Sequence, residues 1–310
     1  MRSLYRAMAR IRRFEERTQE LKEQGEIPGS IHLAIGQEAI PVGFEQELTD
    51  ADWVGATYRG HGWALVKGID PAAIFAEMMG RDSSLNGGRG ASLYFSSARH
   101  RFLGENSIVG AGVAIAAGSA LASLHRGDQS VTVCSLGDGA VNQGIVMETM
   151  NLAAVMELPL VFVVENNVYS EMRKSVDLMR GKSLASRAAG FGIVSYQIDG
   201  NDPLAVMGAA RDALHRARSG GGPTFIEAMT VRLAGHYSGD MQQYRDPEEL
   251  AAAHRDEPLR RIRDVADEEM TADLDHIDAA VALEIENAIE QARATAFPDP
   301  TTAKDHVYVR

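Results

Sequence analysis

Two short groups of residues have the types and spacing that could bind a metal ion and a phosphate together. The first is Gly-Asp-Gly at 137–139, and the second is Asn-Asn at 166–167. Asp138 offers an anionic oxygen and Asn167 a neutral one, which leaves positions on a hard cation such as Mg²⁺ for phosphate oxygens and water. The glycines let backbone N–H groups approach phosphate closely. Each group alone is equally typical of a turn at the end of a strand.

The elements around these groups predict that they meet at one edge of a sheet. Val131–Leu136 and Leu160–Val164 are apolar segments typical of buried strands, and Gln143–Glu157 between them has a helical pattern. Such a strand–helix–strand unit is parallel and right-handed. Both groups therefore follow the carboxyl ends of parallel strands, where doubly wound folds bind ligands. This joint placement favours a metal–diphosphate site over two unrelated turns.

The sequence also resembles a known family over nearly its whole length. Gly-Asp-Gly followed at this distance by Asn-Asn is similar to the thiamine-diphosphate-binding motif. The chain contains, in order, RRFEERTQELKEQGEIPGSIHLAIGQEA, YRGHGWALVKGIDP, NGGRGAS, NSIVGAG, GDGAVNQGIVMETMNLAAVMELPLVFVVENNVY and AGHYSGD. This series resembles the α subunits of thiamine-diphosphate-dependent 2-oxoacid dehydrogenase E1 components, of the pyruvate, acetoin and branched-chain types. The stretch GHYSGD and the residues after it are most similar to the acetoin type.

The resemblance implies a role for each matching position. Asp138 and Asn167 would bind Mg²⁺, with the backbone carbonyl of Tyr169 as a third protein ligand. His32 and His236 would be the catalytic groups near the reacting atoms. Contacts with thiamine diphosphate would come from Tyr58, Arg59, Ser107, Val109, Asp138, Gly139, Ala140, Asn167 and His236.

These positions also have purely structural interpretations. Tyr58 and Arg59 could be a surface pair, and Val109 could belong to the core. A histidine outside such an ordered series is more often a structural residue with its hydrogen bonds satisfied. Because the ordinary histidine pKa lies near neutrality, His32 and His236 are nevertheless suited to handling protons or stabilising a developing oxyanion.

Some positions depart from the family pattern. Tyr94 stands where the family has a histidine, and Ala234 replaces the first histidine of the pyruvate-type His-Gly-His. Tyr237 occupies the place at which many pyruvate enzymes have a phosphorylated serine. Ser170–Lys182 also differs from the run of small residues that the family has there. These departures leave the cofactor motif intact, but they leave the substrate and the proton donors of this loop open.

The pattern in the rest of the chain predicts further strands and helices of the same α/β fold. We expect a strand over Val194–Ile198, a helix over Pro203–Arg218 and a strand over Thr224–Val231, with helical segments at both ends. The expected fold is therefore α/β of the thiamine-diphosphate-binding kind, a parallel sheet flanked by helices. Residues 1–310 are expected to form a single diphosphate-binding domain with N- and C-terminal helical extensions.

The resemblance implies that the site is incomplete without a second chain. Thiamine diphosphate is activated by a glutamate that belongs to a pyrimidine-binding domain. A chain of 310 residues that forms one diphosphate-binding domain has no room for it. In the resembled family that domain lies on a β subunit, in an α₂β₂ heterotetramer with the cofactor at the interface. We therefore expect this chain to be inactive alone.

Composition argues against several classes of protein. A formal net charge of −12 does not suit nucleic-acid binding, which needs a concentrated basic surface. No apolar run is long enough to cross a bilayer. The single cysteine, Cys134, cannot form an intrachain disulfide, which is compatible with a cytoplasmic location.

Two rival functions compete with this interpretation. A dinucleotide-dependent oxidoreductase is suggested by Gly110-x-Gly112 and Gly137-x-Gly139, but the third glycine of that fingerprint is replaced by Ile115 and Asn142. A non-catalytic partner that has kept only the fold is the second, and the intact cofactor residues argue against it.

Within the enzyme class, the substrate and the acceptor stay open. The substrate could be pyruvate, acetoin or a branched 2-oxoacid. The acyl or aldehyde unit could pass to a lipoyl domain, to a carrier protein, or to a second carbonyl compound in an acyloin-forming reaction. Much of the substrate pocket would lie on the β subunit, so this chain does not decide between them.

Overall fold

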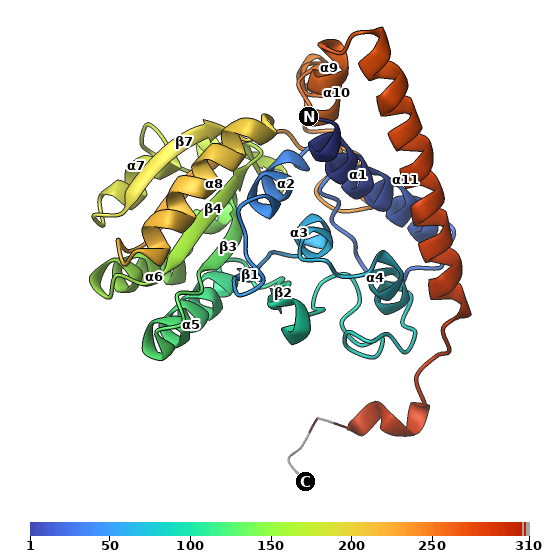
Figure 1. Cartoon of the computed structure of the whole chain (residues 1–310), viewed down its shortest axis with the longest axis horizontal. Helices are drawn as coiled ribbons and strands as arrows, with labels where there is room; N and C mark the ends of the chain where they lie inside the picture. Colours follow the sequence, from blue (N-terminus) through green and yellow to red (C-terminus); the bar gives the residue numbers. More distant parts are fainter. Residues whose placement is uncertain (306, 308–310) are drawn as a thin grey trace.

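A six-stranded sheet forms the centre of the structure, a computed structural model that describes residues 1–305 and 307. Its strands are β1 (Trp53–Gly55), β2 (Phe102–Gly104), β3 (Thr132–Gly137), β4 (Leu160–Asn166), β7 (Val194–Asp199) and β8 (Thr224–Met229). They lie in the order β2-β1-β3-β4-β8-β7, and every neighbouring pair is parallel (Figure 1). A separate antiparallel pair consists of β5 (Tyr169–Ser170) and β6 (Arg173–Lys174). The predicted parallel α/β sheet is confirmed.

Helices cover both faces of this sheet. They are α1 (Arg2–Glu23), α2 (Ala39–Glu45), α3 (His61–Val66), α4 (Pro71–Met78), α5 (Ala111–Arg126), α6 (Gly144–Val155), α7 (Leu184–Ala189), α8 (Pro203–Arg218), α9 (Pro247–Arg255), α10 (Pro258–Asp264) and α11 (Glu268–Ala294). Short 3₁₀ turns are η1 (Ala98–His100), η2 (Asp138–Asn142), η3 (Ser175–Asp177) and η4 (Pro300–Lys304). In residues 1–305 and 307, none of the helices has both the length and the apolar character needed to cross a membrane.

The buried strands divide the apolar side chains between two cores. Val133 and Val161 face the core that is shared with α1, α2, α4, α8 and α11. Cys134 and Phe162, one residue further along, face the core that is shared with α5, α6 and α7. Because successive side chains of a strand point to opposite faces, a strand covered on both sides is a continuous apolar run. This explains the unbroken apolar segments in the sequence.

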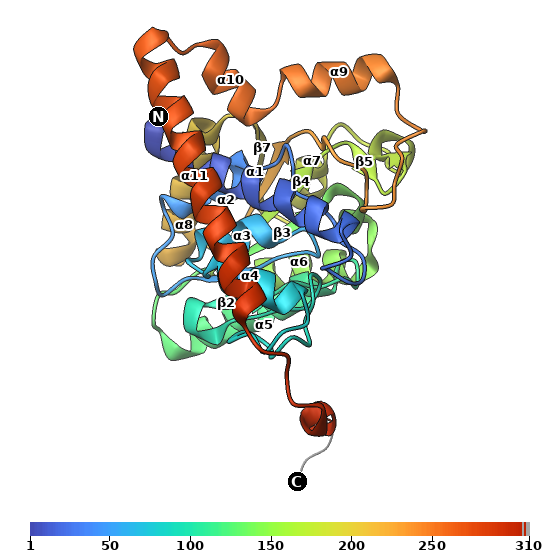
Figure 2. The same ribbon diagram turned by 90° about the vertical axis from the view of Figure 1, so that its right-hand side faces the viewer.

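The helix at the C-terminal end lies along one side of the molecule. α11 packs against α1 and α4, and ion pairs of Glu284 with Arg6 and Arg10 join it to α1 (Figure 2). The segment that contains η4 extends away from the other helices. α8 has the predicted bounds, whereas β1 and β2 were not predicted, since each has only three residues.

The order of the strands creates a crevice at the carboxyl edge of the sheet. The chain passes from β1 outward to β2, and later from β3 to β4 on the other side. Loops that leave neighbouring strands in opposite directions separate at this point, where doubly wound folds bind ligands. Gly137 pairs with Glu165 in the β3–β4 register. Asp138 and the Asn166–Asn167 pair therefore leave the sheet side by side, as predicted.

Candidate functional site

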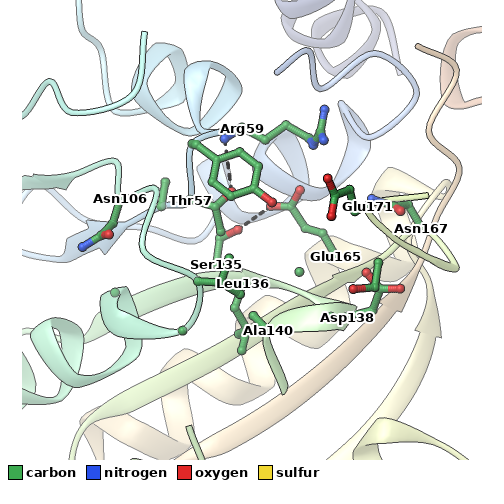
Figure 3. Close-up of a pocket in the computed structure, with 18 of the residues that line it drawn as sticks. Thr57, Arg59, Asn106, Ser135, Leu136, Asp138, Ala140, Glu165, Asn167 and Glu171 are labelled. Atoms are coloured by element: carbon green, nitrogen blue, oxygen red, sulfur yellow. Dashed lines mark hydrogen bonds between the residues drawn. The ribbon is translucent and has the colours of Figure 1, made fainter. Parts of the chain in front are cut away.

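A cavity of about 260 Å³ lies at this edge of the sheet, between the loops that follow β1, β2, β3 and β4. It is lined by nine of the residues predicted from the sequence: Tyr58, Arg59, Val109, Asp138, Gly139, Ala140, Asn167, Tyr169 and His236. Figure 3 shows Asp138 and Asn167 at one end of the cavity and Asn106 at the other. The fold thus brings together residues that are far apart in the sequence.

Two predicted residues, His32 and Ser107, lie beside this cavity rather than in its wall. The ring of His32 packs against Tyr58, with 4.4 Å between centroids, and lies edge-on to His236 at 5.1 Å. Ser107 forms a hydrogen bond with the hydroxyl of Tyr94, the residue found in place of a family histidine. The roles of His32 and Ser107 toward a cofactor stay predictions.

Asp138 supplies a buried carboxylate at the polar end of the cavity. Its side chain is only 3% exposed, and Oδ2 accepts a hydrogen bond from the hydroxyl of Ser175. Burial raises the pKa of Asp138, although hydrogen bonds from Ser175 and from the backbone oppose that change. A carboxylate removed from water in this way is stabilised by a cation beside it. The observation fits a divalent metal at this position.

The other groups at this end that could bind a metal are neutral. Asn167 and Tyr169 line the cavity next to Asp138, and they offer an amide oxygen and a backbone carbonyl. Among the described residues, no group of three or more His, Cys, Asp and Glu side chains could hold a metal ion. A metal bound here would therefore draw further oxygen ligands from a bound diphosphate or from water, as Mg²⁺ commonly does.

Two glycines of the Gly-Asp-Gly group form part of the cavity wall. Gly137 lines the cavity, and a Cβ atom there would have no other atom within 4 Å, so the space beside it is open. A Cβ atom on Gly139 would collide with the hydroxyl of Ser170, so glycine is required for β5 to approach η2. Accessible backbone N–H groups in such a turn suit phosphate oxygens.

Two buried arginines bring positive charge to the cavity. Arg59 donates hydrogen bonds to the backbone carbonyls of Leu33 and His236, the second at 3.0 Å. Arg232 also lines the cavity and donates to the hydroxyl of Tyr244 at 2.6 Å. Burial and the charge of Arg232 lower the pKa of Arg59 to about 10, so Arg59 stays protonated at neutral pH. Both charges attract an anionic ligand such as a diphosphate.

The two predicted catalytic histidines are neutral at physiological pH. Burial and the positive charge of Arg59 lower the pKa of His32 to about 3 and that of His236 to about 4. The Nδ1 atom of His32 is buried and has no hydrogen-bond partner among the described residues. Imidazoles with so low a pKa are weak bases, but a neutral ring still has an N–H group that can donate a hydrogen bond to an oxygen that develops negative charge.

Glu165 is a carboxyl group of the cavity that the sequence pattern did not indicate. Its Oε1 atom accepts hydrogen bonds from Trp63 Nε1 at 2.6 Å and from Ser135 Oγ at 2.5 Å, the latter drawn in Figure 3. Burial raises the pKa of Glu165, while the two hydrogen bonds and Arg59 lower it. In the sequence, only its position directly before the Asn-Asn pair could have indicated that Glu165 lies in the cavity.

The β5–β6 hairpin brings the segment that departs from the family pattern onto the polar end of the cavity. Val168 and Glu171 have φ angles of 63° and 57°, a left-handed conformation that is uncommon for a residue other than glycine. These turns place Glu171 in the cavity wall, on the Asp138 side (Figure 3), and bring Ser175 onto Asp138. Local strain of this kind is concentrated at functional sites.

Comparison with known proteins identifies the family. The sequence matches the family described as "Dehydrogenase E1 component" over residues 6–301. It is 40% identical over 311 residues to the α subunit of acetoin:2,6-dichlorophenolindophenol oxidoreductase from Cupriavidus necator, an overlap of 99% of this chain and 93% of that protein. The Bacillus subtilis subunit of the same name is 40% identical over 308 residues, with 99% and 92% covered. The α subunit of the pyruvate dehydrogenase E1 component from Zymomonas mobilis is 44% identical over 248 residues, with 79% and 70% covered. The chain therefore belongs to the dehydrogenase E1 component family, as one of its thiamine-diphosphate-dependent α subunits.

Proposed function

We propose that this chain holds thiamine diphosphate and Mg²⁺ for an enzyme that decarboxylates a 2-oxoacid or cleaves acetoin. The acyl or aldehyde unit would pass to a lipoyl group or to another acceptor. When bound, thiamine diphosphate supplies a carbanion that adds to a keto carbon and accepts the electrons released on cleavage. The chain as a whole, residues 1–310, would act as one diphosphate-binding domain.

The observation that carries the proposal is the composition of the cavity. One end combines the Asp138 carboxylate, the Asn167 amide and open space beside Gly137, and the arginines of the cavity add positive charge. These groups suit a diphosphate bridged by Mg²⁺ to the protein. His236 lines the same cavity and His32 packs against it, and as neutral groups they would orient a substrate by hydrogen bonding.

The remaining half of the site would come from a β subunit. Val109 is 44% exposed and Ile108 is 69% exposed, although both line the cavity. Apolar side chains at the rim of a ligand cavity are typically covered by the ligand or by a partner chain. We propose an α₂β₂ heterotetramer in which the β subunit provides the activating glutamate, and a cytoplasmic location for it.

Calorimetry of the chain assembled with its β subunit tests the proposal. Wild-type protein is expected to bind thiamine diphosphate only when Mg²⁺ is present, and Asp138→Asn should weaken this binding at least about 100-fold, because a charged ligand is lost. Glu148→Gln, on the exposed side of α6, is the matched control and should bind normally. Equal binding by wild type, Asp138→Asn and Glu148→Gln would refute the assignment of the site.

The substrate is tested separately with the assembled enzyme. Tyr237, which replaces the serine of many pyruvate enzymes, and the names of the two acetoin-type relatives favour acetoin. Turnover is measured with acetoin, pyruvate and branched 2-oxoacids and an artificial electron acceptor. The chain alone should show no turnover with any of them, and activity without the β subunit would contradict the two-chain site.

A further inference from the structure

Gln37 is a buried residue of the cavity wall with one hydrogen bond made and one left unmade. Its side chain is 1% exposed, and Oε1 accepts a hydrogen bond from Asn167 Nδ2 at 2.9 Å. Its Nε2 atom is buried and has no hydrogen-bond partner among the described residues. Gln37 and Asn167 both line the cavity. The side chain therefore contacts a predicted metal ligand and has a second polar group, the Nε2 donor, that is available for a ligand.

The hydrogen bond that is made determines which way the Asn167 amide faces. An asparagine side chain ends in one acceptor oxygen and one donor nitrogen, and a metal ion binds only the oxygen. Because Nδ2 of Asn167 is held by Gln37, Oδ1 is the atom left for the cation. Its hydrogen bond from the Tyr169 amide, at 3.3 Å, is long and leaves a lone pair free. Without Gln37, the amide could rotate and present N–H groups to the metal.

The unpaired Nε2 donor of Gln37 requires an acceptor. A buried N–H group without a partner is destabilising, and such groups in native proteins commonly mark a ligand site or a water site. The cavity beside Gln37 already gathers the charges of Arg59 and Arg232. An anionic oxygen bound there would satisfy Nε2.

Hydrogen bonds and close packing fix the backbone around Gln37, and this fixes the position from which its side chain extends. The Gln37 amide donates to the carbonyl of Ala34 at 2.9 Å. The neighbouring Glu38 carboxylate accepts from the Gly36 amide at 3.0 Å and from Arg12 at 2.6 Å. Gly36 has a φ of 99°, and a Cβ atom there would lie 2.5 Å from the carbonyl oxygen of Val231. This turn is therefore fixed against the segment after β8.

We propose that Gln37 is a positioning residue with two tasks in the cofactor site. Oε1 fixes the Asn167 amide with its oxygen toward Mg²⁺, and Nε2 donates a hydrogen bond to an oxygen of the diphosphate. This inference rests on the proposed function, since it assumes that a metal-bound diphosphate fills the cavity.

Two substitutions separate the tasks. Gln37→Glu keeps an acceptor for Asn167 Nδ2 but replaces the donor with a negative oxygen. Thiamine diphosphate should then bind at least about 10-fold more weakly at saturating Mg²⁺, because a hydrogen bond to a charged group is lost. Gln37→Met removes both groups at similar size. It should weaken the binding of thiamine diphosphate to a similar extent. It should also raise the Mg²⁺ concentration needed for half-saturation by about 10-fold, because a residue that orients a metal ligand is lost.

Calorimetry on the assembled enzyme measures both quantities, with Gln291→Glu on the exposed side of α11 as the charge-matched control. Thermal unfolding without cofactor provides a second readout. A residue needed only for folding would lower the unfolding temperature when replaced. Gln37→Met removes an unsatisfied donor but also the acceptor of Asn167 Nδ2, and these opposing effects should leave that temperature nearly unchanged.

The outcomes distinguish failure of the Gln37 proposal from failure of the proposed function. If Asp138→Asn loses binding while both Gln37 variants bind like wild type, the proposal for Gln37 is wrong and the proposed function stands. Binding that is unaffected in Asp138→Asn as well would overturn the site itself. If Gln37→Met only lowers the unfolding temperature while cofactor affinity is kept, Gln37 is a folding residue and the positioning role is refuted.

Discussion

Glu105 provides a test of the electrostatics beside the site, because it is a carboxyl group buried without compensation. It directly follows β2 and is 6% exposed, and among the described residues neither of its oxygens has a hydrogen-bond partner of good geometry. Beside it lies a fully buried ion pair of His61 with Glu15, at 2.9 Å. Burial raises the pKa of Glu105 to about 8, although the charge of His61 lowers it; Glu15 raises it, and a weak contact with the Gly60 amide lowers it.

The direction of the pH effect follows from where the proton is held. The folded-state pKa of about 8 lies above the ordinary value of 4.5, so between these pH values the folded chain keeps a proton that the unfolded chain has released. Stability therefore falls as the pH rises through this range, by up to about 1.4 kcal/mol for each pH unit. Glu105→Gln has no carboxyl group and escapes this loss. The stability of the variant relative to wild type should thus increase from pH 5 to pH 8 and level off above it.

Urea unfolding followed by circular dichroism, at pH values from 5 to 9, measures this difference directly. Glu105→Met is the matched control. Its free energy of unfolding can differ from that of Glu105→Gln by a constant amount, but the pH dependence of the two variants should be the same, because both lack the titrating group. A stability difference that stays constant with pH would show that Glu105 is ionised in the folded chain, and the reasoning from burial would be wrong.

Three further predictions concern other parts of the structure. Burial raises the pKa of the Cys134 thiol to about 12, so an alkylating reagent at pH 8 should label it only after denaturation, as mass spectrometry would show. Arg218→Ala should lower the free energy of unfolding by about 3 kcal/mol in urea titrations, because the fully buried Asp52 carboxylate loses the guanidinium that pairs with it at 2.8 Å. Gly139→Ala should lower turnover of the assembled enzyme by about 100-fold, since the added Cβ atom displaces Ser170 and the hairpin at the polar end of the cavity.

The centre of the fold could be predicted from the sequence because its signals are local. β3, α6 and β4 are each encoded by the apolar pattern of their own residues, and the glycine and asparagine groups directly follow the strands. β1 and β2 could not be predicted in this way. Each has three residues, and their extended conformation depends on pairing with a strand that lies far away in the chain.

The residues that line the cavity were largely predictable, but their contacts were not. Asp138 and Asn167 were predicted to lie together because each follows a strand of the same strand–helix–strand unit, and both line the cavity. Gln37 lies 130 residues from its partner Asn167, a contact that only the tertiary structure creates. Arg59 was placed at the cavity by resemblance, yet the direction of its guanidinium depends on the carbonyls of Leu33 and His236. Such contacts depend on the packing of distant segments, which periodicity and composition do not encode.

The hydrogen bond between Trp63 and Glu165 gives the protein a built-in optical reporter. The chain has two tryptophans. Trp53 begins β1, at the opposite end of that strand from the cavity, whereas Trp63 donates its indole N–H at 2.6 Å to a carboxyl group in the cavity wall. Indole emission shifts with the charge and polarity next to the ring, so an event that changes the Glu165 environment should change the colour or intensity of Trp63 fluorescence. Replacing Trp53 with phenylalanine would leave a single emitter, through which ligand arrival could be followed in real time without a label.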